Sequence, residues 1–255
     1  MTYIIKNSIT EFHQKLNLDA IFSQFDWSKN LYSKYVVNSN PYFIKIEIIR
    51  DQQELVDDYL LKKVCQIEHR LVLKYYDILI LDQTITGKKA LVSICDYIYN
   101  LNFLEYVTHL HGNKTALTCF IDEIINIFDY LHDRSILHQD INLDNFGIVP
   151  TENGFSPILL DFNFYKSNVE HLVATPEFLD PTYDYLTPYT IHNEKRGLAV
   201  LIYFLLTFDL PFFNRLTQKD QRGSHFRNDL LKTNLLNDNE LELIMKLVNN
   251  EQLQN

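Results

Sequence analysis

The chain has 255 residues, of which 46% are hydrophobic and 22% are charged, a composition typical of folded globular proteins and not of disordered segments. Its formal net charge is −10, which argues against general nucleic-acid binding and against binding to anionic membranes, because both need a basic surface. Only 6 residues are glycine, which weakens any interpretation that needs several glycines around a phosphate.

The cysteines indicate a reducing compartment, and the apolar segments indicate that the chain does not cross a membrane. The three cysteines are far apart in the sequence and form no CxxC pair, so we expect neither a structural zinc site nor a disulfide scaffold. The first residues contain no apolar run of the signal-peptide kind, and the most apolar stretch, residues 198–206, is far shorter than the roughly 20 residues that cross a bilayer. We therefore expect a cytoplasmic protein without membrane insertion.

In chain order, the first half is rich in strand patterns and the second half in helical patterns. Runs of Tyr, Val and Ile bounded by turn residues predict four strands, over residues 31–37, 42–49, 75–81 and 89–95. Apolar residues at helical spacing predict four helices, over residues 53–66, 115–132, 195–208 and 241–248. This order predicts an α+β fold, in which a small sheet lobe with one helix precedes a helical lobe and the boundary falls near residues 97–101.

Three polar side chains follow short apolar segments in the second half. The long helix is followed by ILHQDINLDN, which contains Asp140 and Asn145, and Asp161 follows 16 residues after Asn145 in the segment ILLDFN. Carboxylate and amide oxygens suit a divalent cation, and a neighbouring carboxylate can accept a proton. The two segments together are more specific than an HxD or a DF pair alone.

Six segments resemble segments of the eukaryotic-type protein kinases, in the same order along the chain. YLHDRSILHQDINLDNFGIV resembles the catalytic loop, whose pattern is HRDxxxxN, while LLDFNF is similar to the DFG segment and ATPEFLDPT to the end of the activation loop. YFIK resembles the VAIK strand, SICDYI resembles the hinge, and GLAVLIYFLLTFDLPF resembles a buried kinase helix. The resemblance runs from about Trp27 to Phe213.

The resemblance implies a two-lobed protein kinase-like fold. The N-lobe would be a small antiparallel sheet with one helix, and the C-lobe would be mainly helical and truncated. Residues 1–26 would form an N-terminal extension that packs on the kinase, residues 27–97 the ATP-binding N-lobe, and residues 98–255 the C-lobe with the catalytic loop and the activation segment.

ATP and Mg²⁺ are the cofactors that the resemblance implies. Asp140 would orient the substrate hydroxyl or accept its proton, and Asn145 and Asp161 would hold Mg²⁺ against the ATP phosphates. Lys45 would bind the α- and β-phosphates as a point cation. The further ATP-binding positions are the glycine-loop positions Ser28, Asn30 and Ser33, the hinge positions Cys95, Asp96 and Ile98, and the acidic partner of Lys45. That partner is best matched by Asp58, with Asp57 and Glu54 as alternatives.

The chain departs from the kinase pattern at several positions. The glycine loop has no glycine, so a close approach of its backbone to phosphate is harder. Gln139 replaces the HRD arginine, which makes this a non-RD sequence, and we expect activity that does not depend on a phosphate in the activation segment. Asn163 stands third in the DFG segment, and Glu194 stands where the buried helix usually starts with aspartate.

Phosphoryl transfer to a serine or threonine hydroxyl of a protein substrate is the function that the resemblance favours. Thr175 favours these acceptors, because the family places proline there in tyrosine kinases. Two alternatives stay open: a small-molecule kinase of the aminoglycoside or choline type, and a pseudokinase that acts as a nucleotide-dependent binding module. An activating protein partner is also expected. The size of this chain and its divergence from the kinase pattern resemble those of effectors that bacteria secrete into host cells.

Overall fold

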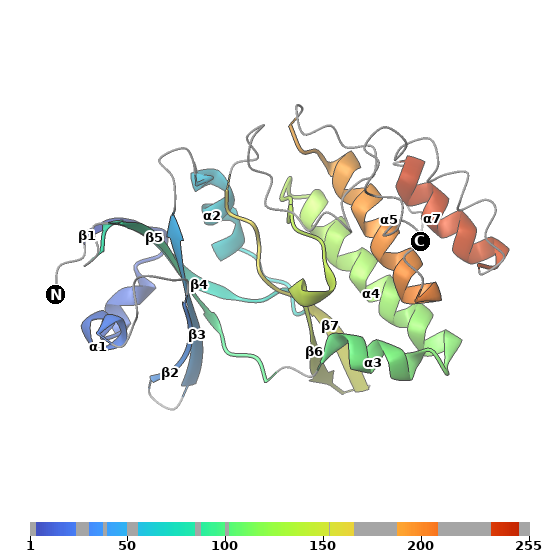
Figure 1. The fold of residues 1–255 in the computed structure, drawn as a ribbon, viewed down its shortest axis with the longest axis horizontal. Helices are drawn as coiled ribbons and strands as arrows, with labels where there is room; N and C mark the ends of the chain where they lie inside the picture. Colours follow the sequence, from blue (N-terminus) through green and yellow to red (C-terminus); the bar gives the residue numbers. More distant parts are fainter. Residues whose placement is uncertain are drawn as a thin grey trace. The chain divides into compact units, whose positions relative to one another are not determined.

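The computed structural model describes residues 4–23, 31–37, 40–49, 56–84, 88–99, 102–152, 154–165, 188–208 and 236–249. Contacts divide the chain into two compact units (Figure 1). The first consists of Met1–Asn100 and Phe164–Lys166, and the second of Leu101–Asn163 and Ser167–Asn255. The α+β class predicted from the sequence is confirmed, with the sheet in the first unit and most of the helices in the second.

The first unit is built on a five-stranded antiparallel sheet in the order β1-β4-β5-β3-β2. Its strands are β1 (Ile4–Ser8), β2 (Leu31–Val37), β3 (Asn40–Ile49), β4 (Tyr75–Gln83) and β5 (Lys89–Asp96). All four predicted strands are present. The strand β1 was not predicted from the sequence, because it is a short edge strand that pairs only with β4.

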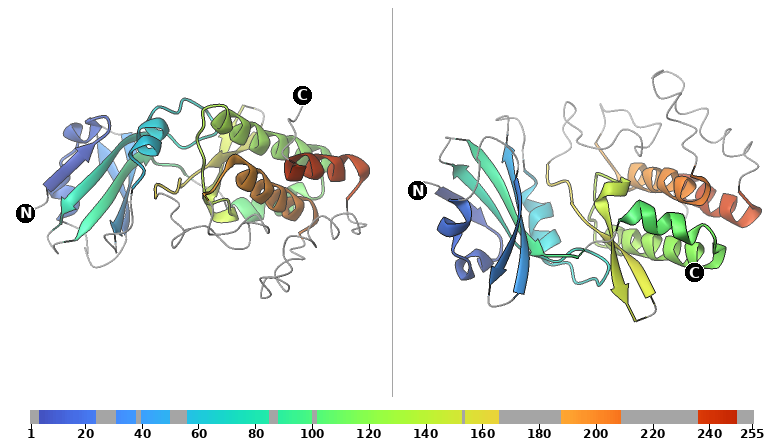
Figure 2. Two further views of the ribbon diagram at one scale, coloured as in Figure 1. Left: turned by 90° about the horizontal axis from the view of Figure 1, so that it is seen from above. Right: turned by 60° about the horizontal axis from the view of Figure 1, so that its bottom comes forward.

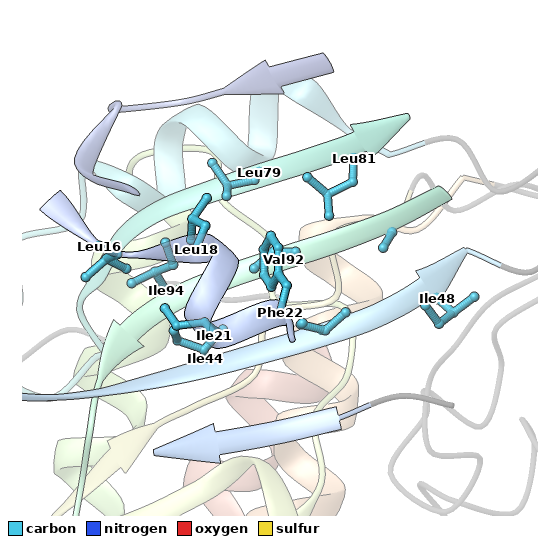
Figure 3. Packing of buried hydrophobic residues seen from close by; sticks show 12 residues of the cluster. Leu16, Leu18, Ile21, Phe22, Ile44, Ile48, Leu79, Leu81, Val92 and Ile94 are labelled. Carbon is cyan, nitrogen blue, oxygen red and sulfur yellow. The ribbon is translucent and has the colours of Figure 1, made fainter. Parts of the chain in front are cut away.

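Side chains alternate along β3 and divide the sheet into two faces. Ile44, Ile46 and Ile48 join a buried cluster with η1 (Phe12–Lys15) and α1 (Leu18–Phe22) close by, and Figure 3 shows the α1 residues Ile21 and Phe22 lying over the strands. Figure 2 shows α1 and α2 (Asp58–Cys65) on opposite faces of the sheet. The N-terminal residues are thus part of the core of the first unit.

The helix α2 begins five residues later than the sequence pattern predicts, at Asp58 instead of residue 53. Asp57 is its N-cap, and the carboxylate accepts hydrogen bonds from the N–H groups of Tyr59 and Leu60 at 3.0 and 3.2 Å. Val56 forms an antiparallel bridge with Tyr165 and is therefore extended. Residues 53–55 lie outside the described part of the chain.

The carboxylate of Asp77 in β4 binds the N-terminal segment to the sheet. Asp77 is fully buried, and its oxygens accept hydrogen bonds from the N–H groups of Ile9, Thr10 and His13 and from the side chains of Ser8 and His13 at 2.9–3.1 Å. Burial alone would raise the pKa of this carboxyl, but the hydrogen bonds from Thr10, His13 and Ser8 outweigh it and lower the pKa. The ionised form is therefore the one that the fold stabilises.

Replacing Asp77 by asparagine should destabilise the protein by roughly 2–3 kcal/mol, because several donors lose an ionised acceptor. The control is Asp82→Asn, which removes a half-exposed carboxylate from the same strand. A folded-state pKa below the unfolded value stabilises the fold above about pH 3.9, and this contribution is lost as pH falls through the folded value. Urea titrations between pH 3 and pH 7 measure it, and equal acid sensitivity of wild type and Asp77→Asn would contradict it.

The second unit contains a two-stranded hairpin and the longer helices. Its elements are α3 (Phe103–Leu110), α4 (Lys114–His132), η2 (Leu143–Asn145), β6 (Phe146–Thr151), β7 (Gly154–Leu159), α5 (Ile191–Thr207) and α7 (Asp238–Asn249). The helices predicted over residues 115–132, 195–208 and 241–248 are present as α4, α5 and α7. Among the described residues, no helix is both long and apolar enough to cross a membrane.

The helix α5 is buried along most of its length and begins earlier than predicted. Thr190 and Asn193 form a capping box at its start, which explains why the helix begins at Ile191 and not at residue 195. Ten of its residues are buried, from Glu194 to Leu205, and the helix packs against α4 and α7. A buried helix that carries one acidic residue near its first turn is unusual, because a buried carboxylate needs hydrogen-bond donors.

Candidate active site

The carboxylate of Glu194 holds the loop that follows α4. Glu194 is fully buried, and its Oε1 accepts a hydrogen bond from the N–H of His138 while its Oε2 accepts one from the N–H of Gln139, both at 3.0 Å. The Nε2 of His132, at the end of α4, lies 3.2 Å from Oε1. One side chain of α5 thus fixes two successive peptide groups of the loop and contacts the preceding helix.

The backbone around Gln139 shows how tightly this loop is constrained. Gln139 has a φ of 68°, a left-handed conformation that non-glycine residues seldom adopt, and it is buried. The His138 ring is also buried, and its Nε2 lies 2.6 Å from the carbonyl oxygen of Leu160. The bonds to Glu194 on one side and to Leu160 on the other stabilise this conformation.

Asp140 and Asn145 are brought together by direct hydrogen bonds. The Nδ2 of Asn145 donates to the backbone oxygen of Asp140 at 2.8 Å and to its Oδ2 at 2.9 Å. The Nδ2 of Asn142 donates to the other carboxylate oxygen of Asp140 at 3.1 Å, and the Oδ1 of Asn142 accepts the N–H of Asn145. The Asp140 carboxylate is therefore held at both oxygens, and the Oδ1 of Asn145 lies outside these bonds.

Asp161 is attached to the same loop by backbone hydrogen bonds on both sides. The N–H of Leu160 donates to the carbonyl of Asn145 at 2.8 Å, and the N–H of Asn163 donates to the carbonyl of His138 at 3.1 Å. Asp161 itself has a φ of 52°, which turns the chain directly after β7, and it is half-buried. The ring of Phe162 packs against His138 with centroids 4.8 Å apart. Backbone hydrogen bonds of Leu160 and Asn163 thus place Asp161 beside the loop that carries Asp140 and Asn145.

Lys45 lies in the first unit, on the face of β3 opposite the α1 cluster. Its Nζ is 3.3 Å from Oε1 of Glu47, and the exposed fractions of the two side chains are 11% and 20%. Of the three expected partners, Asp58 is exposed, Asp57 caps α2, and Glu54 lies outside the described residues. Sequence reasoning missed Glu47, although the strand period of two places residues 45 and 47 on one face.

The residues expected at the hinge lie at and beyond the end of β5. Cys95 is buried, and its Sγ lies 3.6 Å from the carbonyl oxygen of Phe43. The N–H of Asp96 donates to the carbonyl of Lys74 at 3.0 Å, and its carboxylate accepts a hydrogen bond from the hydroxyl of Tyr76 at 2.8 Å. Burial and this bond raise the pKa of Tyr76 to about 12. Ile98 follows the strand and is half-buried.

The remaining predicted positions lie wholly or partly outside the described part of the chain. Ser28, Asn30 and Thr175 are not described. Ser33 is described only by its backbone, which pairs with Ile44 in the β2–β3 ladder. These roles stay predictions.

Comparison with known proteins finds protein kinases at low identity. No family model matches the chain. The cAMP-dependent protein kinase catalytic subunit of Schizosaccharomyces pombe is 25% identical over 193 residues, 71% of this chain and 36% of the relative. The Aurora kinase of Eremothecium gossypii is 29% identical over 133 residues, which are 49% of this chain and 35% of the relative. The serine/threonine-protein kinase Sgk1 of Rattus norvegicus is 29% identical over 138 residues, which are 49% of this chain and 30% of the relative. This chain is a divergent protein kinase-like protein.

The match covers only part of each of these proteins. The chain spans about a third to a half of the length of the curated relatives that it matches first. Their names describe serine/threonine and cAMP-dependent protein kinases, so the coarse function class expected from the sequence is supported.

Replacing Glu194 by glutamine should destabilise the kinase-like protein by about 2 kcal/mol, because one of the two buried N–H groups loses its acceptor. Glu105→Gln, which removes an exposed carboxylate from α3, is the matched control. Hydrogen exchange measured by NMR should show the amides of His138 and Gln139 exchanging at least tenfold faster in Glu194→Gln. After correction for the change in global stability, amides in the centre of α3 should exchange at their wild-type rates. Unchanged exchange at residues 138 and 139 would contradict the role given to Glu194.

Proposed function

We propose that this protein transfers the γ-phosphoryl group of ATP to a serine or threonine hydroxyl of a protein substrate. The observation that carries the proposal is the hydrogen-bonded pair of Asp140 and Asn145, on a loop fixed by the buried Glu194. Backbone hydrogen bonds of Leu160 and Asn163 place Asp161 beside that loop. Phosphoryl transfer needs positioned charge more than covalent chemistry, and a rigid polar loop meets that need.

In this proposal Asp140 orients the acceptor hydroxyl and accepts its proton. Hydrogen bonds from Asn142 and Asn145 hold the two carboxylate oxygens, so the side chain has a fixed orientation before substrate binds. The fixed orientation lowers the entropy lost in reaching the reactive geometry. Asn142 stands where kinases of the HRDxK pattern carry lysine, so it supplies a neutral donor at that position.

Asn145 and Asp161 are the residues that would hold Mg²⁺. Their donor set, one amide oxygen and one carboxylate, is the kind that Mg²⁺ prefers, and the Oδ1 of Asn145 lies outside the bonds that its Nδ2 makes. Bound Mg²⁺ would neutralise charge on the ATP phosphates. Lys45 would add a cation at the α- and β-phosphates, and the backbone of Ser28, Asn30 and Ser33 would contribute N–H donors.

Hinge contacts and substrate preference complete the proposal. The backbone of Asp96 and Ile98 would meet the adenine edge, with Cys95 at the back of the pocket. Thr175 and the relative named as a serine/threonine-protein kinase, Sgk1, support a serine or threonine acceptor. With Gln139 at the HRD arginine position, a binding partner is a better source of activation-segment order than a phosphate.

A nucleotide-binding pseudokinase is the second candidate, because the glycine loop has no glycine and Asn163 replaces the DFG glycine. The two functions differ in one measurable step. Both bind ATP with Mg²⁺, but only the kinase transfers phosphate to a protein. We also propose a cytoplasmic location, of the producing cell or of a host cell, since all three cysteines are free thiols.

Replacing Asp161 by alanine should abolish a Mg²⁺-dependent thermal shift. If Asp161 holds the cation, ATP raises the Tm of the wild type only when a divalent cation is present, since the complex forms only with the folded state. Differential scanning fluorimetry with ATP, with and without Mg²⁺, measures this. Asp144→Ala, which removes an exposed carboxylate from the same loop, is the control and should keep the shift. An ATP shift of equal size with and without metal would contradict the assignment.

Replacing Asp140 by asparagine should lower kcat by roughly 10²-fold or more, because a positioned proton acceptor is lost while ATP binding survives. The assay is transfer of labelled phosphate from Mg²⁺–ATP to proteins of a mixed lysate, with Asp133→Asn as a control at an exposed position near the loop. Transfer at the wild-type rate by Asp140→Asn would disprove this role. Mg²⁺–ATP binding by the wild type without any transfer would favour the pseudokinase.

A further inference from the structure

The strand β3 carries its own acid beside Lys45. Lys45 and Glu47 are two residues apart in an extended strand, so both side chains leave the same face of the sheet. The alternate residues Ile44, Ile46 and Ile48 are buried in the α1 cluster on the other face. The Nζ–Oε1 distance of 3.3 Å makes this an ion pair.

The pair is sheltered from solvent. The Lys45 side chain is 11% exposed and the Glu47 side chain 20%, whereas the Lys89–Asp82 pair of the same sheet is 50% and 45% exposed. Exposed ion pairs are screened by water and salt and contribute little, while sheltered pairs are screened much less. The Lys45–Glu47 pair therefore restricts a flexible side chain more than a surface pair would.

The neighbouring strand adds a polar group to this face. Ser93 of β5 lies directly opposite Lys45 in the antiparallel register, so the two side chains share the face. Ser93 is 1% exposed, and its hydroxyl makes no hydrogen bond within the described residues. Leu91, two residues earlier, lies opposite Glu47. Burying a hydroxyl without a hydrogen-bond partner is costly. Its presence here indicates that the face of the sheet around Lys45 accommodates polar groups.

The described acids of α2 have other tasks. Asp57 accepts two N–H groups as the helix N-cap, so turning its carboxylate towards Lys45 would leave the helix start uncapped. Asp58 is exposed in the first turn, and no ion pair of Asp58 is recorded within the described residues. Neither the Asp57 nor the Asp58 carboxylate forms an ion pair with Lys45 within the described residues.

We propose that Glu47 is the positioning residue for Lys45, in place of an acid supplied by α2. Because the acid and the lysine belong to one strand, their pairing does not depend on where α2 lies. The lysine is thereby held ready for the ATP phosphates at all times. The use of Lys45 for ATP rests on the function proposed above, whereas the pairing itself can be measured without nucleotide.

The first experiment labels lysines in the protein without nucleotide. An amine-acylating reagent is added to wild type, Glu47→Gln, Glu47→Asp, Asp58→Asn and Glu54→Gln, and acetylation of Lys45 is compared with that of the exposed Lys62 by mass spectrometry. A paired ammonium reacts slowly, so Glu47→Gln should raise the Lys45:Lys62 ratio at least threefold. Glu47→Asp should raise it less than Glu47→Gln does, and Asp58→Asn and Glu54→Gln should match wild type.

The second experiment measures ATP binding and turnover in the same variants. Glu47→Gln should raise the KM for ATP about tenfold with a smaller change in kcat and an unchanged Tm, and Glu47→Asp should recover most of the loss. In a Lys45→Met background, adding Glu47→Gln should change the Kd for ATP less than twofold, because the residue that it positions is absent.

Two results would overturn the proposal. One is an unchanged Lys45:Lys62 ratio in Glu47→Gln. The other is a rise in that ratio in Asp58→Asn or Glu54→Gln that equals or exceeds the rise in Glu47→Gln. If the wild type neither binds ATP nor transfers phosphate while the labelling result holds, the proposed kinase function fails and the pairing of Lys45 with Glu47 stands.

Discussion

A buried carboxylate that receives two adjacent backbone N–H groups is the constraint on which the candidate site depends. Glu194 lies in the first turn of α5 and is fully buried, where an ionised group without donors would be very costly. The N–H groups of His138 and Gln139 meet that requirement, and in doing so they fix the loop in a conformation with a left-handed residue. The same two hydrogen bonds therefore stabilise the buried carboxylate of α5 and fix the geometry of the loop.

From this point hydrogen bonds continue to Asp140 and Asn145 and to Leu160 and Asn163 on either side of Asp161. His138 contacts Leu160 and Asn163, Asn145 contacts Leu160 and Asp140, and Asn142 bonds the other oxygen of Asp140. Several members of this set differ from the usual kinase residues, yet each is bonded. Asn142 shows this best, because it both orients Asp140 and caps the short helix η2. The departures from the kinase pattern at Asn142 and Glu194 are thus compatible with a hydrogen-bonded loop.

The first unit relies on a second buried carboxylate, Asp77, for a different purpose. It holds residues 8–13 against β4, so that α1 can cover one face of the sheet with Ile21 and Phe22. With that face closed by the protein's own N-terminal residues, the polar side chains of β3 are left to the opposite face. Lys45, Glu47 and Ser93 share it, and the strand alternation that buries isoleucines on one side places these polar groups on the other.

The sequence alone determined the strands β2 to β5, the helices α4, α5 and α7 and the α+β class, because periodicity is a local property of the chain. It also singled out Asp140 and Asn145, which the structure joins by a hydrogen bond. It could not determine β1, which depends on pairing with β4, or the late start of α2, which depends on the bridge between Val56 and Tyr165. It also placed the partner of Lys45 on a helix, whereas the tertiary structure offers Glu47 of the same strand. The strand β1 and the start of α2 were decided by contacts between distant segments, which a local pattern does not record. For Lys45 and Glu47 the strand period indicates only a shared face, and the tertiary structure decided that their charged atoms pair.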